Sequence, residues 1–383
     1  MITPICAKKK ILIILEATLG GTRKHIFHLL KGFDKEKFQI TFAYSTLRAD
    51  INFFEELQKL RVSRDIELIE IPMCREIAPL KDIISFLRLS CILWKQKFDL
   101  VHCHSSKAGF IGRIATKLMS HGTPTVYTPN SMALNVSRIY KFLEQFAAFF
   151  TSIIIAVADS ERAEIINNKI IGKELVVTIS AGVELETDER STQLRDELNI
   201  PLDAVLVVSV GRLTRQKDPL TFFGMAMEVL RHAPDTRFVW IGDGELREEI
   251  DSFIQANQLG SRCFILGWRT DVAKLLKGCD IFALTSLYES FGYVTCEAMA
   301  CGLPVVATNV TGTMNIVVEG LTGFLVSPQD KNALAQGIMT LVQNESMRIL
   351  LGERGRERVV KHFSVETMVR STELLYERLI AKK

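Results

Sequence analysis

Two glutamates eight positions apart, Glu289 and Glu297, carry the strongest chemical signal in this sequence. Glu289 follows an apolar, strand-like run, and Glu297 falls within a short helical segment that opens at the turn Phe291-Gly292-Tyr293. One carboxylate is therefore expected at a helix N-terminus and the other a turn or two along the helix, with unpaired backbone N–H groups between them. Those N–H groups can hold an anion, and carboxylates accept hydrogen bonds from hydroxyls. The pattern suits a sugar-nucleotide.

Glu297 stands between Cys296 and Ala298 in an otherwise apolar stretch, so its carboxylate is expected to be partly buried and to need a partner. Ribose hydroxyls would supply that partner in a binding site, whereas a buried arginine would supply it in a purely structural one. Gly292 permits close approach of the backbone to a ligand.

A second group of residues supplies positive charge. Gly211 and Arg212 end the apolar run of residues 204–210, and Lys217 follows Arg212 by five positions. At the carboxyl end of a strand, these cations can neutralise a diphosphate leaving group as negative charge develops on it. The alternative is a pair of solvated surface cations, and the position of Arg212 at a strand end favours the functional interpretation.

Two glycine turns join predicted strands to predicted helices. Gly20 and Gly21 follow the apolar run 11–15, and Gly242 follows the run 238–241. Glycine lets the backbone approach a ligand, and a helix end favours anions. Neither turn is a GxGxxG or Walker loop, and a simple turn also requires glycine. For Gly242 the motif alone favours the simple turn.

A polar segment at residues 99–109 contains His102, His104, Ser105 and Lys107. Alternate residues of a strand point to the same face, so the two histidines are expected side by side. No third metal ligand accompanies them in the sequence. Because Ser105 and Lys107 fall where the strand meets the next helix, we interpret His104, Ser105 and Lys107 as candidate surroundings of a sugar or an acceptor.

Sequence signals for metal ions and disulfides are absent. The chain has no Asp-x-Asp motif, which is the usual acidic clamp for a magnesium-bound diphosphate. Arg212, Lys217 and helix ends would have to replace the metal, so neither a metal nor a cofactor is expected. Eight cysteines occur without a CxxC pair or zinc spacing. They are interpreted as free, buried thiols in a reducing cytoplasm.

The elements that must position these residues alternate along a chain of 383 residues, of which 48% are apolar. Short runs rich in Ile, Val and Phe alternate with amphipathic segments. Most runs are apolar on both faces, as in parallel strands covered by helices on both sides. The runs span residues 11–15, 38–44, 100–103, 125–127, 153–158, 175–179, 204–210, 238–241, 264–266, 281–284, 305–308 and 324–326.

The predicted fold is therefore α/β, with two Rossmann-like parallel-sheet domains facing across a cleft. Residues 1–185 form the first domain and residues 186–363 the second. A polar segment at residues 184–194 is interpreted as the linker between them. Residues 364–383 form a helix that closes the fold, back toward the first domain.

Charge is unevenly distributed, although the net charge is only +3. Residues 1–185 carry 25 Lys and Arg against 18 Asp and Glu, and residues 186–383 carry 22 against 26. The basic first half can approach anionic lipid or a phosphorylated acceptor, and ordinary solvated surface explains it equally well. No apolar run reaches the length of about 18 residues that a membrane-spanning helix needs.

Together these elements resemble the retaining glycosyltransferases of the GT-B class, in the large group that shares the Glu-x7-Glu motif. The likeness covers nearly the whole chain, and the motifs keep the order and spacing of that family. The motifs are Gly20-Gly21-Thr22, Asp99 to His104, Ser160-Glu161, Gly182 to Glu184, Gly211 to Leu213 with Lys217, Gly242 to Gly244, Glu289 to Gly302 and Gly320 to Gly323. The first domain would then be the acceptor side, and the second would bind the nucleotide-sugar donor.

The resemblance also implies roles for single residues. Arg212 and Lys217 would bind the donor diphosphate, Glu289 would hold hydroxyls of the transferred sugar as a third catalytic residue, and Glu297 would hold the ribose. The donor-binding backbone would come from Gly20, Gly21, Gly211, Gly242, Phe291, Gly292 and Tyr293. Asn130 stands where many relatives have a histidine near the sugar. Its amide can hydrogen-bond but cannot titrate, so proton transfer is not expected there.

The activity implied by the resemblance is transfer of a hexose-type sugar from a UDP- or GDP-sugar, with retention of the anomeric configuration. The acceptor would be a hydroxyl of a glycan or of a polyprenyl-linked glycan, in the synthesis of a surface polysaccharide such as O-antigen, capsule or exopolysaccharide. The expected location is the cytoplasm or the cytoplasmic face of the membrane, with an anionic membrane surface as a partner. No nucleic-acid partner is expected.

Two other functions fit the same double fold. A sugar-nucleotide epimerase would rework the donor without an acceptor, and a non-catalytic protein would bind the nucleotide without turnover. The Glu-x7-Glu element argues against the first, and the presence of Arg212, Lys217, Glu289 and Glu297 argues against the second. A nicotinamide dehydrogenase fits less well, because no GxGxxG motif opens either half.

Overall fold

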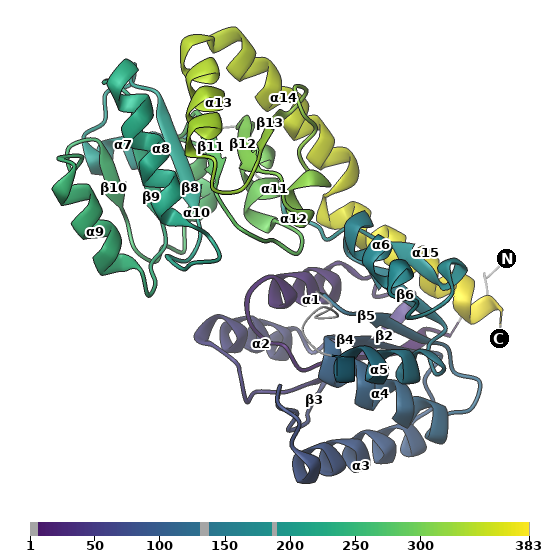
Figure 1. Ribbon diagram of the computed structural model, residues 1–383. Coiled ribbons are helices and arrows are strands. Elements are labelled where there is room, and N and C mark those ends of the chain that lie inside the picture. Colours follow the sequence, from purple (N-terminus) through teal and green to yellow (C-terminus); the bar gives the residue numbers. More distant parts are fainter. Residues whose placement is uncertain (1–6, 131–137, 186–189, 383) are drawn as a thin grey trace, which may run out of the picture. The chain divides into compact units, whose positions relative to one another are not determined.

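The computed structural model describes residues 7–130, 138–185 and 190–382, which form two compact units (Figure 1). Unit 1 comprises residues up to Gly182 together with the chain from Val365 onward, and unit 2 comprises Val183–Ser364. Each unit contains a parallel sheet with helices, so the predicted α/β class is confirmed. The segment 184–194, which we interpreted as a linker, lies partly outside the described residues.

Unit 1 is built on seven parallel strands in the order β3-β2-β1-β4-β5-β6-β7. The strands are β1 (Lys9–Leu15), β2 (Phe38–Tyr44), β3 (Ile66–Glu70), β4 (Leu100–His104), β5 (Thr125–Thr128), β6 (Ile153–Ala156) and β7 (Val176–Thr178). The helices are α1 (Gly20–Gly32), α2 (Ile51–Ser63), α3 (Pro79–Lys95), α4 (Ser106–Met119), α5 (Arg138–Ala148), α6 (Asp159–Asn167) and α15 (Val365–Ala381).

Both faces of this sheet are buried, which explains why its central strands read as continuous apolar runs. Ile11 and Ile13 of β1 pack in a cluster with residues of α1, α2 and α15. Leu12 and Ile14 point to the other face and pack with residues of α3, α4 and α6. The edge strand β3 was not predicted, because its sequence alternates apolar residues with Glu67 and Glu70 and only part of it is buried.

Unit 2 contains six parallel strands in the order β10-β9-β8-β11-β12-β13. They are β8 (Leu206–Val210), β9 (Arg237–Ile241), β10 (Cys263–Ile265), β11 (Ile281–Leu284), β12 (Val305–Thr308) and β13 (Gly323–Val326). The helices are α7 (Gln193–Leu198), α8 (Pro219–His232), α9 (Arg247–Ala256), α10 (Val272–Leu276), α11 (Tyr293–Ala300), α12 (Thr311–Met314), α13 (Lys331–Gln343) and α14 (Glu345–His362).

In each sheet the strand order reverses once. The chain of unit 1 builds outward from β1 to β3 and then returns to add β4 on the other side of β1. Unit 2 does the same at β8 and β11. At such a switch point the connections after the two strands leave in opposite directions, which opens a crevice at the carboxyl edge of the sheet where ligands bind in α/β proteins.

The first helix of unit 2 is held by a buried cation. Arg195 in α7 donates to the carbonyl oxygens of Gly278, Pro201 and Ala204 at 2.7–3.0 Å and to Asp280 Oδ2 at 2.6 Å. Asp280 Oδ2 also accepts from the backbone N–H of Leu206 at the start of β8. These hydrogen bonds therefore attach α7 to the start of β8 and to the segment that precedes β11.

The described cysteines are free thiols, and Cys103, Cys263, Cys279 and Cys296 are buried. The prediction that the thiols are buried is wrong for Cys91, which is exposed on α3. The neighbours of Cys91 in the sequence are mostly apolar, and they gave no sign that this side of α3 is exposed.

The last helix, α15, is tied to the sheet of unit 1 through a buried tyrosine. Tyr376 is fully buried, its ring stacks on Phe33 at 5.6 Å, and its hydroxyl lies 2.5 Å from Nδ1 of His102 in β4. The other ring nitrogen of His102 lies 2.8 Å from Thr128 Oγ1 at the end of β5. The hydrogen bonds run from the last helix through His102 to the carboxyl end of β5.

We predict that Tyr376→Phe lowers the free energy of unfolding by about 1–3 kcal/mol, because it leaves a buried nitrogen of His102 without its partner. Urea unfolding measures this change. Tyr140→Phe is the matched control, since Tyr140 is 40% exposed on α5. Equal stability of the two variants would show that the hydroxyl of Tyr376 contributes nothing to unit 1.

Candidate functional site

The switch point of unit 2 brings a cation and a carboxylate together. β8 and β11 are neighbours in the sheet, and Lys217 and Glu289 lie in the connections that follow them. Lys217 Nζ forms an ion pair with Glu289 Oε1, and the two side chains are only 14% and 9% exposed. Ser286 Oγ donates to the same Oε1 at 2.7 Å. Two of the three residues predicted as catalytic are therefore in direct contact.

Hydrogen bonds between the two connections hold this ion pair in place. Thr285 Oγ1, just after β11, donates toward the carbonyl oxygen of Lys217 at 2.8 Å. The backbone N–H of Leu287 donates to the carbonyl of Gln216 at 2.8 Å. Because both bonds cross from one strand end to the other, the ammonium and the carboxylate are positioned before any ligand arrives.

Arg212, the third residue predicted as catalytic, is exposed. Its guanidinium forms no hydrogen bond or ion pair with the residues that the structure describes. The ammonium of Lys217 donates a hydrogen bond to Glu289, whereas the N–H groups of Arg212 remain available to another partner.

Close approach of two backbones explains the glycines at this edge. A Cβ built on Gly242, where φ is +137°, would lie 2.1 Å from the carbonyl oxygen of Gly211. The same oxygen accepts from the indole N–H of Trp240 at 2.8 Å. A Cβ on Gly211 would press on the Lys217 side chain at 3.3 Å. The interpretation of Gly242 as a tight turn thus has a structural basis, and the binding roles of Gly211 and Gly242 stay predictions.

Helix α11 begins at Gly292, which has φ +85° and precedes Tyr293 as the helix cap. The first backbone N–H groups of a helix have no partner within it, so this end can face an anion. Phe291 is 4% exposed, and its ring packs on Tyr293 at 5.2 Å and on Phe363 at 5.9 Å. Only the backbone of Phe291 is therefore available for the predicted binding role.

Glu297 lies in the second turn of α11 and is half-buried, as its apolar neighbours predict. Burial raises the pKa of Tyr293 and of Cys296, and the carboxylate of Glu297 raises both further. Both groups therefore stay uncharged at neutral pH. Glu297 is not without a partner, and its predicted role toward a ribose stays a prediction.

Unit 1 gathers neutral histidines at its own switch point. The rings of His102 and His104 lie 3.9 Å apart, as their alternate positions in β4 predict, and His25 of α1 lies 5.6 Å from His104. All three are buried. Burial lowers the pKa of each, of His25 to about 3, and the neighbouring histidines lower it further. The cluster is therefore uncharged at neutral pH.

Polar atoms of this cluster lack partners in the described part of the chain. They are His25 Nδ1 and His104 Nε2, both buried. The amide nitrogen of Asn130 lies 3.4 Å from His104 Nδ1. Buried polar groups in proteins are nearly always hydrogen-bonded, so the unpaired atoms mark a place for water or a polar ligand.

The other predicted residues of unit 1 lie around this edge. Ser105 has φ +69°, and its Oγ accepts from the backbone N–H of Ala17 at 3.4 Å. Gly20 has φ +62°, and a Cβ there would meet open space. The ammonium of Lys107 is held by both oxygens of Asp82 at 2.7 and 2.8 Å, which gives this lysine a structural role. Its predicted role at the acceptor stays a prediction.

The sequence did not identify several residues of these two sites. Gly312 lies against Glu289, because a Cβ on it would come within 2.6 Å of the glutamate's Cβ. His25 comes to His104 from a different element, α1, whereas Ser286 lies three residues before Glu289 in the same connection. No local pattern marks Gly312 and His25, since tertiary packing brings them in.

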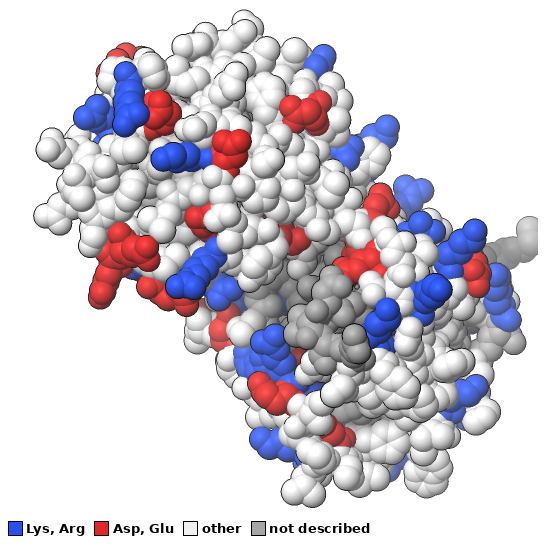
Figure 2. Space-filling model, in the orientation of Figure 1, with Lys and Arg blue, Asp and Glu red and all other residues white. Residues whose placement is uncertain are grey.

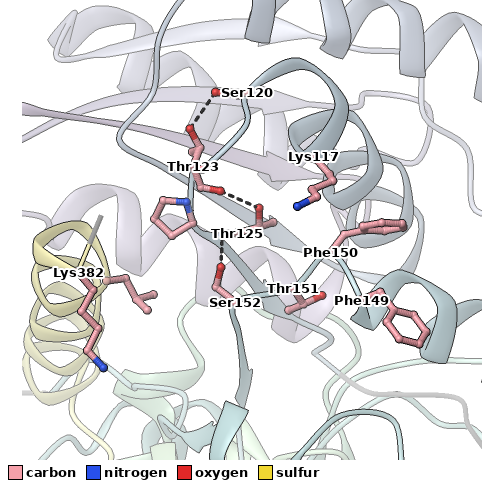
Figure 3. A pocket seen from close by; sticks show the side chains of 12 residues that line it. Lys117, Ser120, Thr123, Thr125, Phe149, Phe150, Thr151, Ser152 and Lys382 are labelled. Carbon is pink, nitrogen blue, oxygen red and sulfur yellow. Dashed lines mark hydrogen bonds between the residues drawn. The ribbon is translucent and has the colours of Figure 1, made fainter.

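A pocket of about 340 Å³ in unit 1 lies away from these residues (Figure 3). Its lining includes Thr125 and Ser152, at the amino ends of β5 and β6, and Lys117 and Lys382 near the ends of α4 and α15. In a parallel sheet the amino ends lie opposite the carboxyl edge. None of the predicted site residues lines this pocket.

Family models match both halves of the chain. The model of "Glycosyltransferase Family 4" matches residues 19–187, and that of "Glycosyl transferases group 1" matches residues 190–358. The UDP-Gal:alpha-D-GlcNAc-diphosphoundecaprenol alpha-1,3-galactosyltransferase of Escherichia coli is 31% identical over 325 residues, which are 81% of this chain and 83% of the relative. The capsular polysaccharide biosynthesis glycosyltransferase CapM of Staphylococcus aureus is 28% identical over 326 residues, 81% of this chain and 84% of the relative.

Solved structures share the fold over almost the whole length. HepE of Anabaena in complex with UDP superposes with a TM-score of 0.81 at 22% identity, covering 96% of this chain and 100% of that one. A glycosyltransferase from Rickettsia africae superposes with a TM-score of 0.83 at 21% identity, covering 99% and 100%.

The neutral histidines predict an acid-sensitive unit 1. An unfolded histidine has a pKa near 6.5, whereas His25 folded has a pKa of about 3. Between these values the unfolded state binds the extra proton, so the free energy of unfolding should fall as the pH drops below about 6.5. Each such histidine contributes roughly 1.4 kcal/mol per pH unit in that range.

Urea unfolding between pH 7 and pH 5 measures this slope. We expect His25→Gln to make the dependence of the unfolding free energy on pH shallower, by the contribution of one histidine. His121→Gln, at an exposed position of the same unit, is the matched control. An identical slope for His25→Gln and the native chain would contradict the assignment of His25.

Proposed function

The chain belongs to the group 1 glycosyltransferases of family 4, and we propose that it moves a hexose from a UDP- or GDP-sugar to a hydroxyl of a glycan or polyprenyl-linked acceptor, with retention of configuration. The observation that carries the proposal is the buried contact between Lys217 and Glu289 at the switch point of unit 2, beside the N-terminal end of α11. This contact supports the proposal, because it brings an ammonium and a carboxylate together at the carboxyl edge of one sheet.

The relatives favour UDP over GDP as the carrier. The Escherichia coli relative is a UDP-Gal-dependent galactosyltransferase, and the Anabaena neighbour has been solved with UDP and with UDP-glucose. We propose that Arg212 and Lys217 bind the diphosphate, that Glu289 accepts hydrogen bonds from the hexose, and that Glu297 holds the ribose.

The proposed reaction is front-face substitution at the anomeric carbon. The bond from the anomeric carbon to the β-phosphate oxygen breaks while the bond to the acceptor oxygen forms on the same face. The acceptor proton passes to the departing phosphate oxygen, so the products are a glycoside and a nucleoside diphosphate. Positive groups held at the leaving phosphate stabilise the charge that develops there, which is the largest contribution a preorganised site can make.

We propose that no divalent cation is required, because Arg212 and Lys217 supply the positive charge at the diphosphate. Among the residues the structure describes, His, Cys, Asp and Glu form no group of three or more that could hold a metal ion.

The acceptor is proposed to be lipid-linked, in the synthesis of a surface polysaccharide, with the enzyme at the cytoplasmic face of the membrane. The support comes from the diphosphoundecaprenol acceptor of the Escherichia coli relative and from the capsular role of the Staphylococcus aureus relative. In the described ranges, no helix is long and apolar enough to cross a bilayer.

We predict that Arg212→Ala or Lys217→Ala lowers turnover about a hundredfold or more, because each removes a group that stabilises the leaving phosphate. Turnover is followed as nucleoside diphosphate released from a UDP-hexose in the presence of EDTA and GlcNAc-diphosphoundecaprenol, the acceptor of the Escherichia coli relative. Arg231→Ala is the matched control, since Arg231 is an exposed residue at the far end of α8, and it should leave turnover unchanged.

Near-normal turnover of both variants would refute the assigned roles. Loss of all turnover with EDTA in the native enzyme would refute the metal-free reaction. Release of an altered sugar-nucleotide without any glycoside would favour the epimerase instead.

A further inference from the structure

Helix α3 of unit 1 exposes an apolar stripe along its whole length. Leu80 is 79% exposed, Leu87 59% and Trp94 75%. The stripe has six members: Leu80, Ile83, Ile84, Leu87, Cys91 and Trp94. Successive members are spaced so that, at 100° per residue, all six fall on one side of the helix, within an arc of roughly 100°.

The opposite side of α3 is already used by the core of the unit. Leu89 and Leu93 are buried against residues of β1 and α4. The stripe is therefore a second apolar face, which the described chain leaves uncovered. Contiguous apolar surface of this kind on a helix marks an interaction site, because water around it is costly.

Helix α5 carries a similar stripe. Ile139 is 65% exposed, Phe142 67% and Phe146 44%, and Phe149 just past the helix is 84% exposed. These positions recur at intervals of three and four, so they share one side of the helix. The acidic side chain of α5, Glu144, is buried in an ion pair with Arg113 and does not interrupt the stripe.

Both stripes belong to the same side of the sheet. α3, α4 and the end of α5 contribute to the cluster on the Leu12 and Ile14 face, and Figure 1 shows the three helices together on that side. In a parallel sheet, the helix that follows a strand starts at the carboxyl edge. The two stripes therefore start at the edge where His104 and Asn130 lie.

Basic side chains run beside the stripe of α3. Lys81, Arg88 and Lys95 are exposed and lie on one flank of it. The single acidic residue of the helix, Asp82, is paired with Lys107. On the face drawn in Figure 2, by contrast, Lys and Arg of unit 1 are scattered among Asp and Glu. The surface is thus defined by the apolar stripe together with the cations that flank it, and not by the net charge of the unit.

We propose that the stripes of α3 and α5 form a surface that docks unit 1 onto a bilayer containing anionic lipid. An interfacial helix has such a profile, with Leu, Ile, Phe and Trp entering the headgroup boundary and Lys and Arg flanking them. The long cationic side chains reach anionic headgroups while their stems cover apolar surface. Docking would bring the carboxyl edge of unit 1 to the layer in which a polyprenyl-linked acceptor resides.

The experiment is co-sedimentation of the full chain with vesicles, without donor or acceptor, so that it stands apart from the proposed function. Vesicles of phosphatidylcholine alone are compared with vesicles containing one part phosphatidylglycerol in three. We expect binding to the anionic vesicles, weakened as KCl rises from low to physiological and higher concentrations. Leu87→Glu/Trp94→Glu should lower the partition coefficient about tenfold or more.

The matched control is Val62→Glu/Leu374→Glu. Val62 and Leu374 are 74% and 57% exposed on α2 and α15, which cover the other face of the same sheet, and this variant should bind like the native chain. Thermal unfolding confirms that both variants fold, and turnover on a water-soluble acceptor should be unchanged in both.

Several outcomes would overturn the proposal. The native chain would fail to bind anionic vesicles, or both double variants would bind equally well. Alternatively, the native chain would be a dimer that Leu87→Glu/Trp94→Glu dissociates, without any vesicle binding. The stripes would then be an interface between copies of this chain.

Discussion

The ion pair between Lys217 and Glu289 is the contact on which the proposed chemistry of unit 2 depends. Removing two charges from water is expensive, and a buried pair seldom stabilises a fold more than apolar packing would. This pair joins two segments 72 residues apart that meet only because β8 and β11 are neighbours at the reversal of strand order. The ion pair therefore contributes by positioning rather than by stability, since it holds an ammonium and a carboxylate at fixed places in the connections before α11.

Unit 1 meets the same topological constraint with different side chains. Its switch point carries buried, uncharged histidines, and Glu16, directly after β1, is paired with Arg48. Tyr376 and Thr128 fix the ring of His102. One ring nitrogen of His25 and one of His104 have no hydrogen-bond partner in the described chain, so these uncharged rings can still bond a further polar group. Neutral donors and acceptors of this kind can form hydrogen bonds with the hydroxyls of a ligand. The two units therefore differ in the side chains that each sheet places at its switch point.

Much of this arrangement could be predicted from the sequence. Runs apolar on both faces gave the central strands, with the bounds of β2, β11 and β12 as predicted, because burial on both sides leaves no room for polar residues. Glu289 and Lys217 were recognised because strand ends and a glycine turn mark them locally. The partners of Lys107 and His102 were not, since Asp82 and Tyr376 are distant in sequence and only packing brings them in. The exposed side of α3 was missed for a related reason, because a helix that is apolar on two sides reads as buried.

The most direct test of the account is calorimetric titration of the native enzyme and of Glu289→Gln with UDP and, separately, with a UDP-hexose. If Glu289 holds the hexose, the variant should bind the UDP-hexose roughly tenfold to a hundredfold more weakly, as expected for a lost hydrogen bond to a charged group. Its affinity for UDP should not fall, since UDP lacks the sugar and the ammonium of Lys217, released from Glu289, stays available to the diphosphate. Equal losses for both ligands, or none for either, would contradict the assignment of Glu289 to the transferred sugar.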